Sequence, residues 1–597
     1  MEMGDYYLRL KKEFRHRKHG EWFPVTMGEL SAAMDCTRRN AQFLVQKLKN
    51  NRYIDWKPGL GRGNISQLAF LRNAEELMLD RARNLAARGQ ISEALAHLAS
   101  WEDESVHAEF RLWLGEQFGI QQKRSGEEAD ILRFPFYRPV PDLDPLQVIR
   151  RTEAHFIRQI FDTLVQYEPA EQCLKPGLAH HWEYEEDYRK WTFYLRKGVR
   201  FHHGKTLTAG DVQYTFQRIQ QQRGVQDWLA DSIQEMEILS STRICFYLRE
   251  PNALFAHFIA TERFSIVPDD LEQRSLRRDF TRLPVGTGPF AISANNESVL
   301  VLEANERYYS GRPFLDRTEM WVWPNYEEVL PEGVQTDSEL QLLYFEANSK
   351  GAADQTLYQL ETGSTVLTFN LSKEGVLHDE RIRQAVHLVL DRQRMILELQ
   401  GKRQQTASGF VPGDYDPMYT GGCSTNAARE LLNASSYAGQ VLELYTYEFF
   451  SNEEDVLWIK RECGKIGLKL NITVLPIREL HSAAHLDAAD MIYGGEVLSD
   501  EPSITLIEMY RTPNGYIRSH LDPELRIAVD IMISEALREA ELTQRMHILG
   551  KIERELKHRS NVLFIYHSLQ SVGHDQSFQG MSMNAWGKIN YKDVWVK

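Results

Sequence analysis

Residues 36–71, CTRRNAQFLVQKLKNNRYIDWKPGLGRGNISQLAFL, carry the pattern that decides the fold of the first part of the chain. From residue 38 onward, apolar side chains recur at helical spacing and polar side chains occupy the opposite face. The apolar positions are Ala41, Leu44, Val45 and Leu48, and the polar positions include Arg39, Gln42 and Gln46. This spacing predicts an amphipathic helix with Thr37 as its N-terminal cap.

Two short strands joined by a glycine-rich turn are predicted after this helix. Residues 53–57 and 66–71 have the composition of strands, and residues 58–64 between them contain three glycines and one proline. Lys57 and Arg62 give the hairpin positive charge, and Asn64 stands at the end of the turn. A hairpin of this kind behind a helix is the wing of a winged helix.

The residues before position 36 complete the motif. Tyr7, Leu10 and Phe14 are spaced as one apolar stripe of a first helix. Thr26 and Glu29 have capping-box spacing, which predicts a short second helix that ends near residue 34. Two short helices, a tight turn and a third helix with a polar outer face form a helix-turn-helix, so residues 1–72 are predicted to be a winged-helix domain.

The charge and chemistry of this domain favour double-stranded DNA as its partner. Residues 1–72 carry 14 Lys/Arg against 7 Asp/Glu, a net charge of +7. The whole chain has a net charge of −14, so residues 73–597 have a net charge of −21. Arginine pairs with guanine and glutamine with adenine in the major groove. The predicted DNA-binding residues are Thr37, Arg38, Arg39, Gln42, Gln46, Lys57, Arg62 and Asn64. Phe43 is assigned to the core, and a contact with a thymine methyl group is the alternative.

The stretch 36–71 resembles, closely and over the whole module, the N-terminal domain of SgrR-type transcriptional regulators. The resemblance implies sequence-specific DNA binding, whereas composition alone implies only affinity for a polyanion. The alternative from the residues themselves is a winged helix that docks another protein.

Residues 73–130 are predicted to connect this domain to the rest of the chain. They are rich in Ala, Leu, Glu and Arg at helical spacing, with a break at residues 88–90. We expect a helical hairpin, a third helix near residues 110–118 and a polar boundary at residues 121–130.

Residues 131–597 are too many for one simple core and are predicted to form two α/β lobes. Residues 441–447 and 468–474 alternate as strands around a helix for which Asn452 is the predicted cap. Ligands of parallel sheets bind beyond the carboxyl ends of the strands, so Tyr447 is predicted to face a cleft. Gly494, Gly495, Glu496 and Asp500 form a second predicted rim.

Three stretches of this region resemble the family 5 solute-binding proteins, the peptide- and nickel-binding receptors of bacterial transporters. They are WTFYLRKGVRFHHGKTLTAGDVQYTFQRI, VGTGPF (residues 285–290) and LTFNLSKEGVLHDERIRQAVHLVLDRQRMI, and the C-terminal MNAWGKINYKDVW also matches. The resemblance implies a two-lobed, type II periplasmic-binding-protein-like fold with the second lobe near residues 371–560. Asn370, in the third stretch, joins the predicted ligand-binding residues.

One departure from that family bears on the ligand. Peptide-binding members place an aspartate in the second lobe to hold the ligand's amino terminus, and Leu498 takes that position here. A short peptide is therefore disfavoured as ligand, although Glu496 or Asp500 can substitute. A small polar metabolite is expected, and the regulator resemblance implies a sugar or sugar phosphate.

Other functions lack support in the sequence. Adjacent histidines, as in His180-His181 and His202-His203, point in different directions, so neither a metal site nor a cofactor is predicted. Neither a nucleophile elbow nor a phosphate loop is present, and an enzyme is not expected. The beginning of the chain has no apolar run typical of an export signal. The overall prediction is a cytoplasmic, ligand-responsive transcription regulator without membrane association, of undetermined oligomeric state. The alternative is a cytosolic solute- or peptide-binding protein whose winged helix docks a protein.

Overall fold

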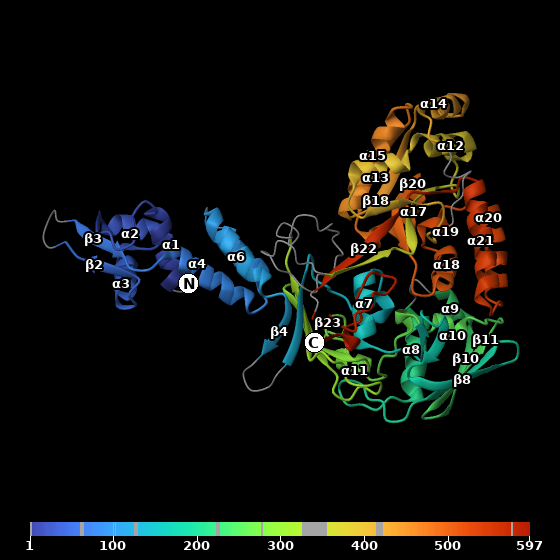
Figure 1. The fold of residues 1–597 in the computed structure, drawn as a ribbon, viewed down its shortest axis with the longest axis horizontal. Coiled ribbons are helices and arrows are strands. Elements are labelled where there is room, and N and C mark those ends of the chain that lie inside the picture. Colours follow the sequence, from blue (N-terminus) through green and yellow to red (C-terminus); the bar gives the residue numbers. More distant parts are fainter. Residues whose placement is uncertain are drawn as a thin grey trace. The chain divides into compact units, whose positions relative to one another are not determined.

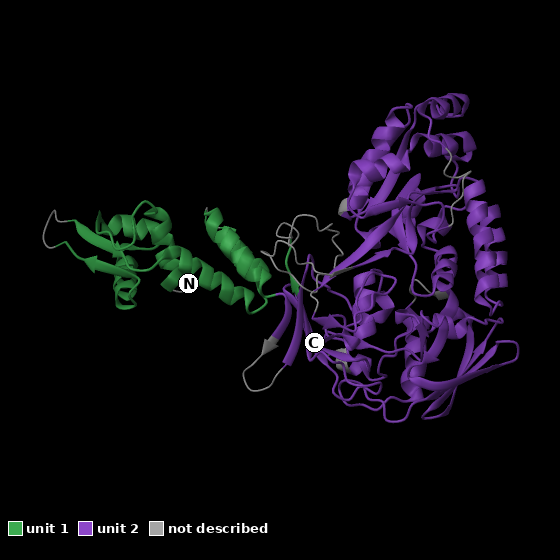
Figure 2. Ribbon diagram, viewed as in Figure 1, with its two compact units in different colours: residues 1–117, 321–329, 346–348 green, residues 118–320, 330–345, 349–597 purple. Residues whose placement is uncertain are grey.

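The structure is a computed structural model that describes residues 3–59, 65–99, 101, 103–123, 129–222, 227–275, 279–324, 355–413, 422–574 and 577–597. It divides into two compact units. The first contains residues 1–117, 321–329 and 346–348, and the second contains the remainder (Figure 2). The boundary at residue 117 falls inside the predicted connector. None of the described helices combines the length and apolar character needed to cross a membrane.

The first unit begins with the predicted winged helix. A three-stranded antiparallel sheet of order β1-β3-β2 lies beside three helices (Figure 1). Its elements are α1 (Met3–Glu13), β1 (Phe23–Val25), α2 (Met27–Ala33), α3 (Arg38–Asn50), β2 (Ile54–Lys57) and β3 (Ser66–Phe70). The Thr26 hydroxyl accepts a hydrogen bond from the Glu29 amide at 3.2 Å, and the Thr26 amide donates to the Glu29 carboxylate at 2.7 Å. The predicted capping box is therefore confirmed.

Three further helices belong to the same compact unit. They are α4 (Ala74–Ala86), α5 (Ile91–Ala99) and α6 (Glu104–Gly115). The third begins six residues before the predicted start, because the Asp103 carboxylate caps it by accepting from the Ser105 amide at 2.9 Å. α4 packs against α1, and Arg81 forms an ion pair with Asp5 between these two helices.

The first lobe of the second unit contains two sheets. One has the order β10-β11-β9-β8, and the other has the order β12-β13-β14-β5-β4. Their strands are β4 (Gly119–Lys123), β5 (Ala129–Phe136), β8 (Ala179–Glu185), β9 (Lys190–Leu195), β10 (Ile233–Ser240), β11 (Arg243–Leu248), β12 (Phe290–Asn295), β13 (Val299–Ala304) and β14 (Arg317–Val322). The helices α7 (Arg151–Ile160), α8 (Ala209–Gln222), α9 (Asp227–Ser232), α10 (Phe255–Phe258) and α11 (Leu271–Ser275) accompany them, with the strand pair β6 (Val165–Glu168) and β7 (Cys173–Pro176).

The second lobe is built on a five-stranded sheet of order β19-β18-β20-β16-β21. Its strands are β16 (Gly363–Phe369), β18 (Val441–Tyr447), β19 (Lys469–Leu475), β20 (Met491–Val497) and β21 (Val562–Phe564). The sheet thus extends beyond both ends of residues 371–560. The strand β18 is parallel to β19 and β20, which confirms the predicted strand, helix and strand. The intervening helix α15 (Phe450–Gly464) starts before Asn452, so the predicted Asn452 cap is wrong.

The remaining helices of the second lobe accompany this sheet. They are α12 (Glu380–Val389), α13 (Arg392–Leu399), α14 (Thr425–Ala434), α16 (Ile477–Leu480), α17 (Ala483–Ala488), α18 (Pro502–Arg511), α19 (Tyr516–Ser519), α20 (Pro523–Ala536) and α21 (Leu542–His558). Buried side chains of α18, α20 and α21 join the cluster that contains Phe193 and Phe246 of the first lobe. Two smaller sheets complete the unit: β15 (Gln355–Leu360), β22 (Tyr566–His574) and β17 (Arg403–Thr406), and the pair β23 (Phe578–Gln579) and β24 (Trp595–Val596).

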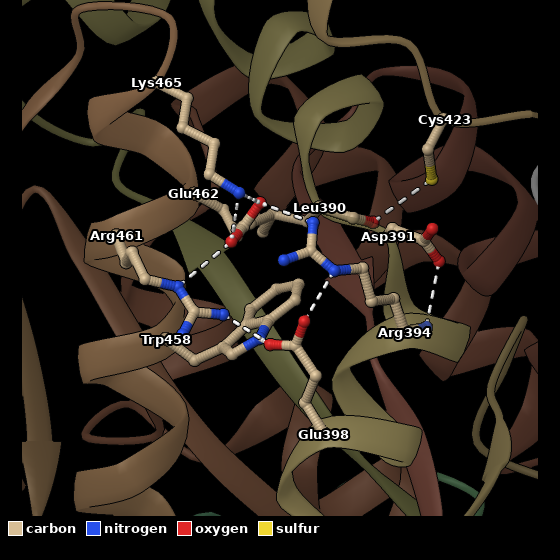
Figure 3. Close-up of polar contacts among 9 residues, drawn as sticks. All are labelled: Leu390, Asp391, Arg394, Glu398, Cys423, Trp458, Arg461, Glu462 and Lys465. Atoms are coloured by element: carbon tan, nitrogen blue, oxygen red, sulfur yellow. Dashed lines mark hydrogen bonds and ion pairs between the residues drawn. The ribbon is translucent and has the colours of Figure 1, made fainter.

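Polar contacts hold α15 against α13 on the outer side of the second lobe (Figure 3). The Glu398 carboxylate accepts from the Trp458 indole at 2.8 Å and from Arg394 at 2.6 Å, and these contacts, with one from Arg461, lower its pKa to about 2. Glu462 accepts two hydrogen bonds from Lys465, at 2.6 and 2.7 Å. These contacts position the helix whose first turn lies at the cleft described below.

Candidate functional site

The helix α3 presents a polar stripe to solvent. Its opposite face buries Ala41, Leu44, Val45 and Leu48, as the periodicity predicts. The exposed stripe consists of Arg39, Gln42, Phe43 and Gln46, which are spaced at i, i+3, i+4 and i+7. Since α3 contains no aspartate or glutamate, this surface carries positive charge without acidic neighbours on its own helix.

Phe43 corrects one expectation from the sequence. Its side chain is 56% exposed, so its assignment to the core is wrong. The reason is that the four buried positions already fill the inner face of α3, and Phe43 falls outside the sector that they define. The Lys47 ammonium lies 4.5 Å from the centre of its ring.

The start of α3 is fixed by a side-chain cap. The Thr37 hydroxyl accepts a hydrogen bond from the Asn40 amide at 3.3 Å, which confirms the predicted cap. Arg38 and Arg39 therefore stand exposed in the first turn. The Gln46 amide donates to Asn50 at 3.0 Å along the same helix.

Of the basic residues predicted for the hairpin, only Lys57 lies among the residues that the structure describes. Lys57 is exposed at the end of β2, and its ammonium lies 3.9 Å from the centre of the Trp22 ring. Arg62 and Asn64, the other two residues predicted for the wing, lie outside the described residues.

Two adjoining cavities in the second unit are lined by residues of both lobes. The Asp500 cavity, of about 710 Å³, includes Arg158 and His257 of the first lobe with Asp500 of the second. The Glu496 cavity, of about 260 Å³, includes Arg150 of the first lobe and Tyr447, Gly495 and Glu496 of the second. Together they form a cleft between the lobes, as predicted from the carboxyl ends of the parallel strands.

Glu496 is a carboxylic acid in a poorly hydrated part of this cleft. Burial raises the pKa of Glu496 to about 7, and the neighbouring Tyr516 hydroxyl acts in the opposite direction. Among the described residues no cation forms an ion pair with Glu496. The group is therefore able to donate or to accept a hydrogen bond near neutral pH.

Further unsatisfied polar atoms lie in the same cavity. Glu448 Oε2 and Asn452 Nδ2 are buried without a hydrogen-bond partner among the described residues, and both residues line the Glu496 cavity. Buried polar atoms normally have partners, so these two indicate a position for a polar ligand or water. Both come from the segment that directly follows β18.

Ion pairs cross the cleft from the first lobe to the second. Arg158 of α7 contacts Asp500 at 2.8 Å and Glu262 at 3.4 Å, and its guanidinium lies 3.9 Å from the centre of the Trp586 ring. His257 Nδ1 and Glu501 Oε2 are 2.8 Å apart. The other close pairs at the cleft are Arg150 with Glu448 and Arg151 with Glu361.

Two predicted ligand residues have structural contacts instead of lining either cavity. The Asn370 amide donates to the carbonyl oxygens of Leu486 at 3.1 Å and Ala489 at 2.9 Å. Gly494 lies within β20, which continues through both glycines where the sequence predicted a strand end. A Cβ at Gly494 would meet the Tyr516 hydroxyl at 3.1 Å, so the glycine gives room to that ring.

His202, of the second histidine pair, has hydrogen-bond partners in the backbone. His202 Nε2 is 3.0 Å from the Gly288 carbonyl oxygen, and His202 Nδ1 accepts from the Gly286 amide at 3.3 Å. Within the described ranges, no group of three or more His, Cys, Asp or Glu side chains is arranged to hold a metal ion.

Comparison with protein families identifies the larger part of the chain. Residues 174–516 match the model of the bacterial extracellular solute-binding proteins, family 5. The chain belongs to this family. Residues 3–121 match a second model, described as the N-terminal domain of a sugar transport-related sRNA regulator, so a family 5 domain follows an SgrR-type N-terminal domain.

Relatives with the same extent support this domain composition. The chain is 30% identical to the uncharacterized protein YhjP of Bacillus subtilis over the full length of both chains. It is 27% identical to the HTH-type transcriptional regulator SgrR of Yersinia pestis, with 98% of each chain covered.

Solved structures of bacterial binding proteins share the fold of the second unit. The dipeptide-binding protein of Pseudoalteromonas sp. SM9913 in complex with Met-Leu gives a TM-score of 0.65 at 17% identity, and covers 78% of this chain and 100% of its own. DppA of Helicobacter pylori in complex with the peptide STSA gives 0.64 at 20% identity, covering 78% and 98%. These likenesses show a periplasmic-binding-protein-like α/β fold.

Glu496 and Asp500 are the two acids of the cleft that can substitute for the aspartate of the peptide-binding members. Leu498, which takes the position of that aspartate, is apolar and fully buried. Asp500 is engaged by Arg158 and also accepts from the Ala585 amide at 2.8 Å. Of these two acids, Glu496 is therefore the one that is available to a ligand.

Replacing Glu496 with glutamine is expected to change how stability depends on pH. The folded pKa of about 7 exceeds the ordinary value of 4.5, so the folded state binds the proton more tightly and the wild type loses stability as pH rises from 4.5 to 7. The glutamine variant lacks this loss. Denaturant unfolding at pH 4.5 and pH 8 should show the variant gaining stability relative to wild type at pH 8. Asp487→Asn, at an exposed carboxyl that lines neither cavity, is the control, and an equal gain there would contradict the assignment.

Proposed function

We propose that this chain is a transcription regulator that binds double-stranded DNA through α3 and the β2–β3 hairpin and a small solute through its family 5 cleft. The observation that carries the DNA part is the exposed stripe Arg39, Gln42, Phe43 and Gln46 on a helix without acidic residues. The SgrR-type N-terminal domain supports the same role. Such a regulator acts in the cytoplasm, where the chromosome lies.

The chemistry of the stripe fits base edges in the major groove. Arg39 can donate two hydrogen bonds to guanine, Gln42 can pair with adenine, and the exposed Phe43 ring can contact a thymine methyl group. Arg38 and Lys57 carry charge beside the stripe and are suited to phosphate contacts. Arg62 and Asn64 are proposed to extend these contacts along the wing.

Salt dependence of DNA binding tests this function. The probe is the duplex that flanks the chain's own gene, because regulators commonly control their own neighbourhood. If Arg38, Lys47 and Lys57 each neutralise a phosphate, the logarithm of affinity should fall against the logarithm of salt with a slope of roughly −2.7. A winged helix that docks only a protein would give neither a shift nor such a slope.

The cleft is proposed to bind and release a small polyhydroxylated solute, such as a sugar, without catalysis. Glu496, Asn452 and Glu448 supply hydrogen-bond groups that a set of hydroxyls can satisfy. Three cleft arginines, at positions 150, 151 and 158, already contact carboxylates of the chain. A phosphate at any of these three arginines would have to displace a carboxylate, and the further cations of the Glu496 cavity are Arg263 and Lys402. We therefore rank a neutral sugar first, a sugar phosphate second and a short peptide third.

Calorimetric titration of a panel of neutral sugars, their phosphates and dipeptides tests this ranking. The expected result is heat from at least one neutral sugar, lost or weakened in Asn452→Ala, with the sugar recovered unchanged. Binding confined to phosphates or dipeptides would reverse the ranking. Conversion of the bound sugar would indicate an enzyme.

Solute and DNA are expected to affect each other's binding. Coupling between two sites is reciprocal, so the solute should change DNA affinity by the same factor by which DNA changes solute affinity, typically about 5- to 150-fold. Both titrations use the full chain, each with the other ligand absent and then saturating. Two independent affinities would remove ligand response from the proposal and leave DNA binding in place.

A further inference from the structure

A third cavity lies wholly within the first compact unit. Its volume is about 720 Å³, which falls in the range of small-molecule sites. Its lining includes the end of α1 and the start of α4, two helices that contact each other. The loop after α1, the residues that lead into α4 and the loop before α6 form its walls.

Positive charge dominates these walls. Six of the 14 Lys/Arg residues of residues 1–72 line the cavity, together with two histidines and the indole of Trp101. The six are Lys11, Lys12, Arg15, Arg17, Lys18 and Arg72. So many cations around one concave surface repel each other unless an anion lies between them.

Two of the three acidic residues that line the cavity contact α6 instead of the lining cations. The Asp103 carboxylate caps α6 by accepting from the Ser105 amide and hydroxyl, at 2.9 and 2.7 Å. Glu104 forms an ion pair with Arg111. Glu75 and Glu21 lie near Lys11, whose pKa is lowered by burial and raised by these two glutamates. Of the three acids that line the cavity, Asp103 and Glu104 are thus engaged with α6 and Glu75 lies beside Lys11.

Aromatic rings hold several of these cations in place. The Arg17 guanidinium lies 5.2 Å from the centre of the Phe23 ring, and the Arg72 guanidinium lies 4.4 Å from the centre of the Tyr53 ring. Because the rings restrain the side chains, a ligand meets donors that are already oriented.

The cavity is separate from the surface assigned to DNA. No residue of α3 lines it. The Gly20 amide in its loop donates to the Phe70 carbonyl oxygen at 2.8 Å, at the end of β3 remote from the hairpin turn. DNA contacts by α3 and the wing therefore leave this charge unexplained.

We propose that this cavity binds a small organic polyanion with at least two phosphate or carboxylate groups. Arginine and lysine donate strong charge-assisted hydrogen bonds to both kinds of group. Trp101 offers an apolar surface for the remainder of the molecule. The site adjoins both the winged helix and α4, so an occupant would contact both parts of the first unit.

Calorimetric titration of the full chain with pyrophosphate, with citrate and with glycerol, in the absence of DNA, tests the proposal. Pyrophosphate, citrate or both should bind, and glycerol should not. Pyrophosphate alone would indicate a phosphate ligand, citrate alone a polycarboxylate, and both the shared polyanion chemistry. Failure of both anions to bind would overturn the proposal.

Variants assign the binding to the cavity. Arg72→Gln should weaken the bound anion about tenfold or more, as expected for a lost charge-assisted hydrogen bond. Lys18→Gln, whose side chain has no aromatic partner among the described contacts, should weaken it without disturbing the fold. Arg88→Gln removes an exposed charge outside the cavity and should have little effect, as should Arg39→Ala in α3. Equal weakening by Arg88→Gln and both cavity variants would contradict the site.

Discussion

Alanine at Asp455 is expected to lower the free energy of unfolding by about 3 to 5 kcal/mol, because it removes the fully buried partner of a buried guanidinium and leaves only the part-exposed Glu454, at 3.0 Å, as counter-charge. Asp455 is fully buried, and its carboxylate accepts from Arg403 at 2.7 Å, from the Tyr493 hydroxyl at 2.5 Å and from the Tyr566 hydroxyl at 2.6 Å. The Arg403 side chain is only 2% exposed, so water cannot replace the lost contact. Denaturant unfolding of the second-unit transition measures the loss.

A double variant separates the unpaired charge from the loss of packing. Asp455→Leu combined with Arg403→Met removes both charges and keeps comparable volume, so it should recover much of the stability lost in Asp455→Ala. If the double variant is as unstable as the sum of the two single variants, the cost lies in packing and not in the stranded charge.

Alanine at Arg39 is expected to weaken binding to the specific DNA site by about 1 to 3 kcal/mol and to blur its specificity. Arg39 is exposed in the first turn of α3, the part of a recognition helix that meets base edges. The measurement compares the duplex flanking the gene with a random duplex of the same length at one salt concentration. Arg88→Ala removes an exposed charge elsewhere in the same unit and serves as control. Equal losses on the two duplexes would assign Arg39 to phosphate contact alone.

The fold of the first unit could be predicted from the sequence because each helix cap and each buried helix position depends on residues that are close together in the chain. The capping box at Thr26, the Thr37 cap and the burial of Ala41 and Leu44 depend on residues within one or two helical turns. Phe43 was misassigned for the same reason, since it is apolar but lies just outside the buried sector. Local pattern identifies a helical face more reliably than it identifies each member of that face.

The cleft could be predicted only in part, because its contacts join distant parts of the chain. Tyr447, Gly495 and Glu496 followed from the carboxyl ends of the strands. Arg150 and its partner Glu448 are 298 residues apart, and no periodicity connects them. The family 5 resemblance supplied the two-lobed fold but not these charges, which the three-dimensional structure alone brings together.

The contacts between the lobes have a consequence for the conformation of the molecule when no solute is present. The ion pair of Arg158 with Asp500 and the contact of His257 Nδ1 with Glu501 favour the arrangement in which the two sides of the cleft are near each other, whether or not a solute lies between them. The closed arrangement of the two lobes is then populated to some extent even without a solute. Asp500→Asn is expected to lower this population in the absence of solute, while a saturating solute would still close the cleft.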